Sequence, residues 1–232
     1  MKTNFITKIL FMSLLTMFGL QLNAQDWANL KCYQAENDSL LVPAKNEIRV
    51  VFMGNSITQQ WKEKHPEFFK NNPYICRGIS GQTTPQMLVR FRQDVVSLQP
   101  KVVVILAGTN DIAGNTGPST LEMIMDNLSS MAELARANGI HVVLSSVLPA
   151  YNYPWKHGME PNVKIPKMNV LIKTYCEKHG IVYLDYFAKM NNGNNGMIAE
   201  YTTDGVHCTS KGYDLMESLV VPAIEKALKT KL

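Results

Sequence analysis

The chain has 232 residues, enough for one domain of ordinary size with a full hydrophobic core. Hydrophobic residues make up 46% of it and charged residues 18%, a balance that excludes an intrinsically disordered protein. The formal net charge is +4; two of the 23 Lys and Arg residues lie in the first 24 positions, leaving 21 against 19 acidic residues. A surface of such mixed sign gives no electrostatic case for binding nucleic acid.

The first 24 residues have the pattern of a secretory signal peptide. Lys2 and Lys8 give a basic start, residues 9–22 form an apolar stretch, and Ala24 places a small residue before a plausible cleavage point. The apolar stretch is short and interrupted by polar residues, so a retained membrane anchor is the less favoured alternative. We therefore expect an exported protein, periplasmic or extracellular, with no stable membrane span after cleavage.

Residues 25–44 are expected to form a helical lead-in to the domain. Apolar residues recur at helical spacing over 26–42, and Pro43 should end that helix. The apolar contacts of this helix are expected to come from Trp27, Leu30, Tyr33 and Leu40.

From residue 45 to 232, strand-like and helical patterns alternate. The strand-like runs are short, apolar and rich in Val or Ile, as strands buried on both faces are. This alternation implies one domain with a parallel sheet covered by helices on both faces, a three-layer α/β fold. The predicted strands are 48–53, 74–79, 101–107, 141–147 and 181–185, and the predicted helices are 59–70, 85–98, 119–138, 165–179 and 209–229, the last kinked or divided at Pro222.

Ligands bind parallel sheets of this kind at the carboxyl ends of the strands, so the residues found there matter most. The first strand ends in Gly54-Asn55-Ser56, the second in a stretch that contains Gly81, and the third in Gly108-Thr109-Asn110-Asp111. Asp204-Gly205-Val206-His207 stands just before the last helix. Together these stretches supply the parts of an acyl-transfer site.

The chemistry of ester hydrolysis explains these residue types. A serine hydroxyl such as that of Ser56 needs a base during attack, and His207 is the candidate. The imidazole needs a carboxylate that fixes its tautomer, which Asp204 can provide from three residues away. The oxyanion formed by attack needs preorganised donors, and the amides of Ser56 and Gly81 and the side chain of Asn110 would serve.

Each of these residues also has a purely structural explanation. Ser56 could simply cap a helix, Gly81 and Asp204 could form turns, Asn110 could bond its own loop, and His207 could be a surface histidine. Their occurrence together, at the ends of successive strands, is what favours catalysis.

The four stretches resemble the sequence blocks of the GDSL-type esterases and lipases, also called SGNH hydrolases. "GNSIT" is similar to the nucleophile block, "RGISGQTT" to the glycine block, "GTND" to the asparagine block and "DGVH" to the acid–base block. The resemblance covers about residues 45–230. It is nearest to the platelet-activating-factor acetylhydrolase-like proteins and the carbohydrate acetylesterases.

This resemblance implies a three-layer α/β/α sandwich with a flavodoxin-like, five-stranded parallel sheet. It also implies Ser56 as nucleophile, Asp204 and His207 as the rest of a triad, and Ser56, Gly81 and Asn110 as the oxyanion hole. The sequence departs from the family at one position, where Asn55 replaces the usual aspartate before the serine. Asparagine keeps a hydrogen-bond acceptor at that position, and the triad acid lies elsewhere.

Other catalytic motifs find little support. The sequence has no G-x-S-x-G, so it lacks the nucleophile elbow of α/β-hydrolases. Asp204, His207 and Cys208 would crowd three metal ligands onto one turn, so we expect no metal and no cofactor. In an exported protein the four cysteines could pair in three ways, although two of them lie in core-like runs. The sequence leaves that question open.

The stretch after the fourth strand, residues 148–166, reads as an irregular loop on the same side as Ser56. Its aromatic residues could stack on sugar rings, or Trp155 could anchor the loop to the body. Trp155 and Tyr153, with Asn55 beside the nucleophile, are the candidate substrate-binding residues.

These observations predict a secreted serine esterase that removes short acyl groups, above all acetyl, from carbohydrates. The expected partner is a small-molecule or glycan ester. Two alternatives remain: a lipase or lysophospholipase on the same machinery, and a glycan-binding module without catalysis.

Overall fold

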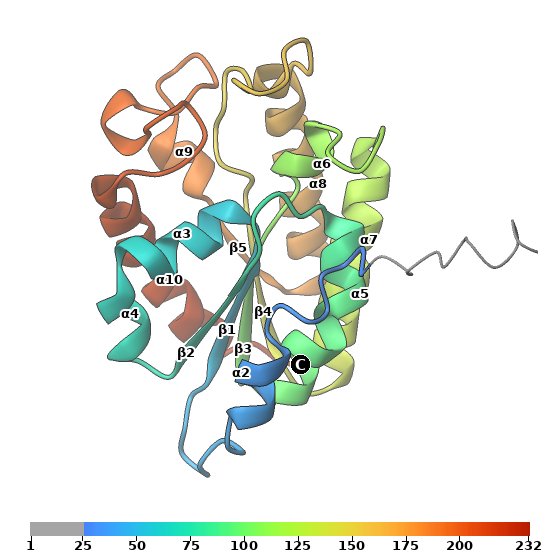
Figure 1. The fold of residues 1–232 in the computed structure, drawn as a ribbon, viewed down its shortest axis with the longest axis vertical. Helices are drawn as coiled ribbons and strands as arrows, with labels where there is room; N and C mark the ends of the chain where they lie inside the picture. Colours follow the sequence, from blue (N-terminus) through green and yellow to red (C-terminus); the bar gives the residue numbers. More distant parts are fainter. Residues whose placement is uncertain (1–25) are drawn as a thin grey trace, which may run out of the picture.

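The computed structural model describes residues 26–232, so the predicted signal peptide lies outside the described residues. A five-stranded, all-parallel sheet with strand order β2-β1-β3-β4-β5 forms the centre of the domain, and helices cover both of its faces (Figure 1). The predicted three-layer α/β/α fold is confirmed. The strands are β1 Val50–Gly54, β2 Tyr74–Gly78, β3 Val102–Leu106, β4 His141–Ser145 and β5 Val182–Leu184.

The register of the sheet brings the carboxyl ends of the first three strands level with one another. Gly54 at the end of β1 pairs with Gly78 of β2 on one side and with Leu106 of β3 on the other. The loops that follow these strands therefore leave the sheet at one edge, where the topology of a parallel sheet places ligand sites.

Two sets of helices cover the sheet (Figure 1). Helices α3, α4, α9 and α10 lie on one face, and α5, α7 and α8 lie on the other. Short 3₁₀ helices over Val96–Leu98 and Ala199–Tyr201 complete the described elements. The helices are α2 Gln34–Ser39, α3 Ser56–Lys64, α4 Pro66–Lys70, α5 Thr84–Asp94, α6 Thr109–Ile112, α7 Leu121–Ala137, α8 Pro161–His179, α9 Tyr186–Met190 and α10 Ser210–Ala227.

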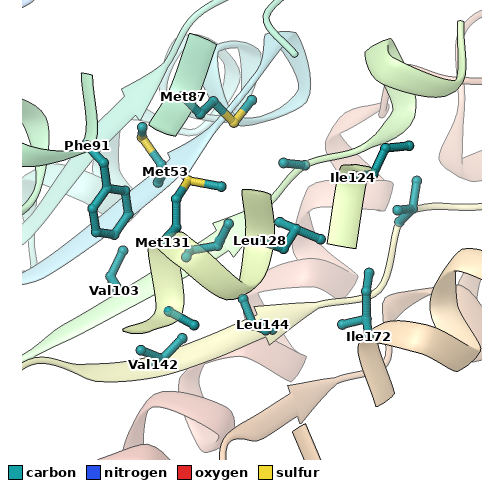
Figure 2. Close-up of a cluster of buried hydrophobic side chains, with 14 of the residues drawn as sticks. Met53, Met87, Phe91, Val103, Ile124, Leu128, Met131, Val142, Leu144 and Ile172 are labelled. Carbon is teal, nitrogen blue, oxygen red and sulfur yellow. The ribbon is translucent and has the colours of Figure 1, made fainter. Parts of the chain in front are cut away.

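Each face of the sheet has its own hydrophobic core. The core under α5, α7 and α8 is aliphatic and methionine-rich, with Met53, Met87 and Met131 close together in Figure 2. The core under α3, α4 and α10 is aromatic, and Phe52 and Phe68 both contact Trp61 edge-on or stacked. Burial of such large side chains contributes about 1.5–3 kcal/mol each, so both layers hold the sheet firmly.

The lead-in differs from its prediction, because only Gln34–Ser39 is helical within residues 26–42. The Asp26 carboxylate accepts hydrogen bonds from the amides of Leu30 and Lys31, and Asn29 has φ +55°. These turn features compete with a continuous helix. Trp27 and Leu30, expected to be apolar contacts, are 46% and 37% exposed.

Two proline effects also differ from what the sequence suggests. The helix expected over 59–70 is divided at His65, because a residue before proline is disfavoured in the helical region. In contrast, α10 is not divided at Pro222 but continues past it as one helix. Its buried face, which includes Tyr213, Met216 and Val220, supplies packing that outweighs the missing backbone hydrogen bond.

None of the helices within residues 26–232 combines the length and the apolar character that a membrane span requires. All four cysteines are free thiols; Cys32 is exposed, and Cys76, Cys176 and Cys208 are buried.

Candidate active site

Ser56 begins helix α3 directly after β1. The N-cap of that helix is Asn55, whose side-chain oxygen accepts a hydrogen bond from the amide of Ile57 at 3.0 Å. Ser56 is therefore not the cap, and its hydroxyl is free for another role. Asn55 is 1% exposed, so its expected part in substrate binding gives way to a structural part in the turn.

Two glycines let α3 lie close against the sheet. A Cβ added to Gly54 would lie 2.1 Å from the hydroxyl oxygen of Thr58, and one added to Gly78 would lie 2.3 Å from the amide nitrogen of Gln59. No larger residue fits at either position without a shift, so the strand-end glycines set the distance between the sheet and the turn that carries Ser56.

A second loop brings the histidine to this serine. The Ser56 hydroxyl oxygen lies 3.0 Å from His207 Nε2, and His207 Nδ1 lies 2.7 Å from the Asp204 carboxylate. The other carboxylate oxygen of Asp204 accepts hydrogen bonds from the amides of Val206 and His207, at 2.9 and 2.8 Å. The carboxylate thus fixes both the loop and the imidazole ring.

Two hydrogen bonds link helix α3 to α10 and to the loop that carries His207. The hydroxyl of Tyr213 in α10 donates to the carbonyl of Ile57 at 2.8 Å. Lys64 at the end of α3 donates to the carbonyl of Cys208 at 2.6 Å. Because these bonds join the helix of the serine to the segment of the histidine, the short contact between the two side chains has a rigid base.

The Asp204 carboxyl is suited to remain ionised. Partial burial opposes its charge, but the hydrogen bonds from the backbone and ring of His207 and from the amide of Val206 outweigh burial, so the pKa of Asp204 is lowered. A carboxylate at that position favours the tautomer of His207 with its proton on Nδ1, which leaves Nε2 free to accept the Ser56 proton.

The groups expected to donate to an oxyanion have N–H groups for which the described residues provide no intramolecular acceptor. The Ser56 amide lies at the first position of α3, where amides have no intrahelical acceptor. Gly81 has φ +76°, and a Cβ there would meet only Asn115 Nδ2 at 4.0 Å, so its backbone borders open space. Asn110 Nδ2 donates one hydrogen to the carbonyl of Gln82 at 2.9 Å, which leaves its second N–H available.

The aromatic loop forms a wall next to the histidine. Trp155 is 45% exposed, and its ring centroid lies 6.1 Å from that of His207. Tyr153 stacks on Trp155 at 5.1 Å and bonds Thr109 through its hydroxyl at 2.8 Å, but it is only 1% exposed. Trp155 can therefore meet a ligand, whereas Tyr153 supports Trp155 from behind, contrary to its expected contact with substrate.

Two cavities flank the site. One of about 550 Å³ has a polar lining that includes Ser80, Gly81, Asn115 and Lys156. The other, of about 380 Å³, lies beside Asp204. The second cavity has a mainly apolar lining that includes Tyr151, Pro154 and Met197.

The described residues hold one group of side chains close enough together to share a metal ion, and it contains none of the candidate catalytic residues. Ligand atoms of His65, Asp214 and Glu217 fall within 4.8 Å of one another. The Glu217 oxygen, however, already contacts His65 Nδ1 at 2.8 Å and accepts from Trp61 Nε1 at 3.0 Å, which links α3 to α10. Cys208, beside the histidine, is fully buried, with its thiol toward Met216.

A comparison with protein-family models identifies the family of this chain. The model of the GDSL-like lipase/acylhydrolase family matches residues 52–215. The chain belongs to this family, whose members are esterases. The match contains the strand ends that carry Ser56, Gly81 and Asn110 and the loop before α10 that carries Asp204 and His207.

Two solved structures of Bacteroides proteins resemble this family member over most of its length. A candidate acylhydrolase from Bacteroides fragilis NCTC 9343 is 50% identical, with a TM-score of 0.86, over 88% of this chain and 100% of its own. A GDSL-like lipase from Bacteroides thetaiotaomicron VPI-5482 is 50% identical, with a TM-score of 0.84, over 86% of this chain and 98% of its own.

A curated relative, an acetylxylan esterase of Xylanibacter ruminicola, is 24% identical in an alignment of 222 positions that covers 81% of this chain and 45% of that protein. The chain spans less than half the length of the curated relatives it matches.

Sequence reasoning missed several residues that shape the site. Gln82 and Asn115 bond Asn110 and the Gly81 carbonyl, respectively, and Arg90 lies buried behind them. Gln82 stands inside a recognised stretch, but its orientation could not be read from the sequence. Arg90 lies in a helical pattern where an arginine ordinarily faces solvent, so no sequence signal distinguished it.

Proposed function

We propose that the protein is an exported serine esterase that hydrolyses short-chain esters, above all acetyl esters of carbohydrates. The observation that supports this most is the continuous chain of contacts from the Ser56 hydroxyl to His207 at 3.0 Å and from His207 to Asp204 at 2.7 Å. A hydroxyl, an imidazole and a carboxylate in this order are the parts of a nucleophilic triad.

In the proposed mechanism, Ser56 Oγ attacks the ester carbonyl while its proton passes to His207 Nε2. Asp204 stabilises the resulting imidazolium. The amides of Ser56 and Gly81 and the Asn110 side chain stabilise the oxyanion. His207 then gives its proton to the departing alcohol, which leaves an acyl-enzyme on Ser56. Water, deprotonated by His207, releases the acid and restores the serine.

The larger of the two cavities that flank the site supports a short acyl group. A long acyl chain contributes about 0.8 kcal/mol for each buried methylene, and this requires an extended apolar lining. The larger cavity beside Gly81 is instead lined by polar groups such as Ser80, Asn115 and Lys156. An exposed tryptophan next to His207 suits the flat face of a sugar ring, and the acetylxylan esterase among the relatives acts on an esterified glycan.

The decisive experiment measures acetate release from acetylated polysaccharides and from 4-nitrophenyl acetate by wild type, Ser56→Ala and His207→Ala. Each substitution should lower kcat by several orders of magnitude, because triad residues act as a unit, and should leave the fold unchanged by circular dichroism. A Ser56→Ala protein that retains wild-type turnover would refute the mechanism, and a wild type that releases no acetate from any of these substrates would leave the glycan-binding alternative.

A second series separates the carbohydrate and lipid alternatives. We expect kcat/KM to fall from acetate through butyrate to octanoate, since the polar cavity beside Gly81 offers a longer chain little apolar surface to bury. Trp155→Ala should lower kcat/KM more on an acetylated oligosaccharide than on 4-nitrophenyl acetate. A rate that rises with chain length would favour a lipase, and equal losses on both acetates would make Trp155 a loop anchor.

Export rests on the sequence of residues 1–24 alone. Export would bring the enzyme to polymeric glycans outside the cytoplasm. Fractionation of cells that express the full chain tests this, with the mature N-terminus determined by mass spectrometry.

A further inference from the structure

A buried arginine, Arg90, forms hydrogen bonds to chain segments that carry residues of the candidate oxyanion hole. Arg90 in α5 is 0% exposed and uses every nitrogen of its guanidinium. Nε donates to the side chain of Gln82 at 2.6 Å and Nη1 to Asp94 at 2.9 Å. Nη2 donates to two backbone carbonyls, those of Gly54 at 3.1 Å and Arg77 at 2.8 Å.

Two of these partners lead directly to the site. Gly54 is the last residue of β1, two residues before Ser56, so its carbonyl belongs to the turn that delivers the nucleophile. Gln82 follows Gly81, and the backbone carbonyl of Gln82 accepts the hydrogen bond from Asn110 Nδ2 at 2.9 Å. The bond from Arg90 to the Gln82 side chain therefore holds the residue that orients the Asn110 amide.

The lead-in completes this support from outside the matched family region. The Gln82 side chain donates to the carbonyl of Ala28 at 2.7 Å, and Asn37 donates to Asp94 at 2.7 Å. Residues 26–39 thus form hydrogen bonds with both side chains, Gln82 and Asp94, that accept from Arg90. A buried charge without such partners is strongly destabilising, so the network must be complete for the arginine to stay in place.

We propose that Arg90 is a positioning residue for the oxyanion hole, acting through Gln82 on the side chain of Asn110 and through the Gly54 carbonyl on the turn of Ser56. This inference rests on the proposed esterase function. A planar group with five donors in fixed directions can hold three chain segments in one geometry, which a flexible lysine cannot do. Displacement of a catalytic donor by about 1 Å can lower the rate a hundredfold.

A double-mutant cycle tests the connection to Asn110. Gln82→Met removes both side-chain bonds of Gln82 at nearly constant volume. We expect it to lower kcat on 4-nitrophenyl acetate by about tenfold or more, with KM changed less than about threefold, since the lost interaction acts in the transition state. In an Asn110→Ala background the same substitution should lower kcat by less than about twofold, because the donor that it positions is already absent.

Arg90→Lys and a matched control, Arg49→Lys, distinguish positioning from general stability. Arg49 is also buried, at 6% exposed, and its side chain bonds Glu47 and the carbonyls of Leu41 and Leu98, none of which belongs to the network around Arg90. Both variants should lower the melting temperature, and only Arg90→Lys should lower kcat. If Arg90→Lys fails to fold, the Gln82→Met cycle still decides the matter.

Two outcomes would overturn the proposal: an unchanged kcat for Gln82→Met, or an equal loss with and without Asn110. Failure of the esterase function is distinguishable, because wild-type hydrolysis would then be absent or would persist in Ser56→Ala.

Discussion

An alanine at Gly78 would push helix α3, and the serine that begins it, away from the sheet. The added Cβ would lie 2.3 Å from the amide nitrogen of Gln59 and 2.7 and 2.8 Å from backbone atoms of Thr58 and Asn55. Ordinary contacts begin at about 3.5 Å, so the backbone of α3 must move by about 1 Å. All three neighbours are main-chain atoms, and no side-chain rotation can relieve the overlap.

This displacement has two measurable consequences. Overpacking should destabilise the protein by about 1–3 kcal/mol, seen as a lower urea midpoint. Movement of the Ser56 turn by about 1 Å should lower kcat on 4-nitrophenyl acetate by about a hundredfold. The structure also implies that the loss of kcat exceeds any change in KM, because the ester itself meets no new atom.

Gly139→Ala provides the control for Gly78→Ala. A Cβ at Gly139 would meet no atom within 4 Å, but its φ of +72° makes alanine strained by about 1–2 kcal/mol. It should therefore lower stability to a similar degree and leave kcat unchanged. If Gly78→Ala lost stability but kept wild-type turnover, the close packing of α3 would not be what positions Ser56.

Three further substitutions test individual residues. Asn110→Ala should lower kcat by about 10²–10³ with little change in KM, the effect of losing one preorganised donor, and a change confined to KM would make Asn110 a binding residue only. Asn55→Asp should change kcat by less than about tenfold, because aspartate keeps the acceptor for the Ile57 amide; complete loss of activity would contradict this structural part. Burial raises the pKa of Asp111, although hydrogen bonds from Thr84 oppose this shift. The folded state therefore binds the carboxyl proton more tightly than the unfolded state does. As a result, the stability of the fold decreases as the pH rises from about 4 through the folded pKa of Asp111. Asp111→Asn should remove this dependence of stability on pH. Urea titrations at pH 4.5 and 7.5 should therefore show that the variant gains stability relative to wild type at the higher pH. A stability difference that is the same at both pH values would contradict the proposed titration of Asp111.

The sequence by itself determined the succession of strands and helices along the chain and the residues at the ends of the strands. Short apolar runs alternate with helical patterns, and only a parallel sheet covered on both faces buries all of them. All five predicted strands are present, each within two residues of its expected ends. Ser56, Gly81 and Asn110 stand at these ends because strand termini are marked locally, by glycine and small polar residues.

Contacts between distant segments were decided only by the tertiary structure. Ser56 and His207 are 151 residues apart, and their 3.0 Å contact depends on the bonds between α3 and α10. The same holds for Tyr153, whose aromatic character suggested a sugar platform but whose burial makes it a support. Whether an aromatic side chain faces a ligand or the core depends on neighbours that a local pattern does not contain.

The lead-in and Arg90 show this limit most clearly. Helical spacing over 26–42 predicted a continuous helix, but the turn bonds of Asp26 and the network around Arg90 hold most of that segment in a non-helical path. An arginine within an amphipathic helix is expected to face solvent, because the local hydrophobic period indicates only which face of the helix a residue occupies. Arg90 is nevertheless buried and bonded to three separate segments. Only long-range packing brings the side chain of Gln82 and the carbonyls of Gly54 and Arg77 within reach of one guanidinium.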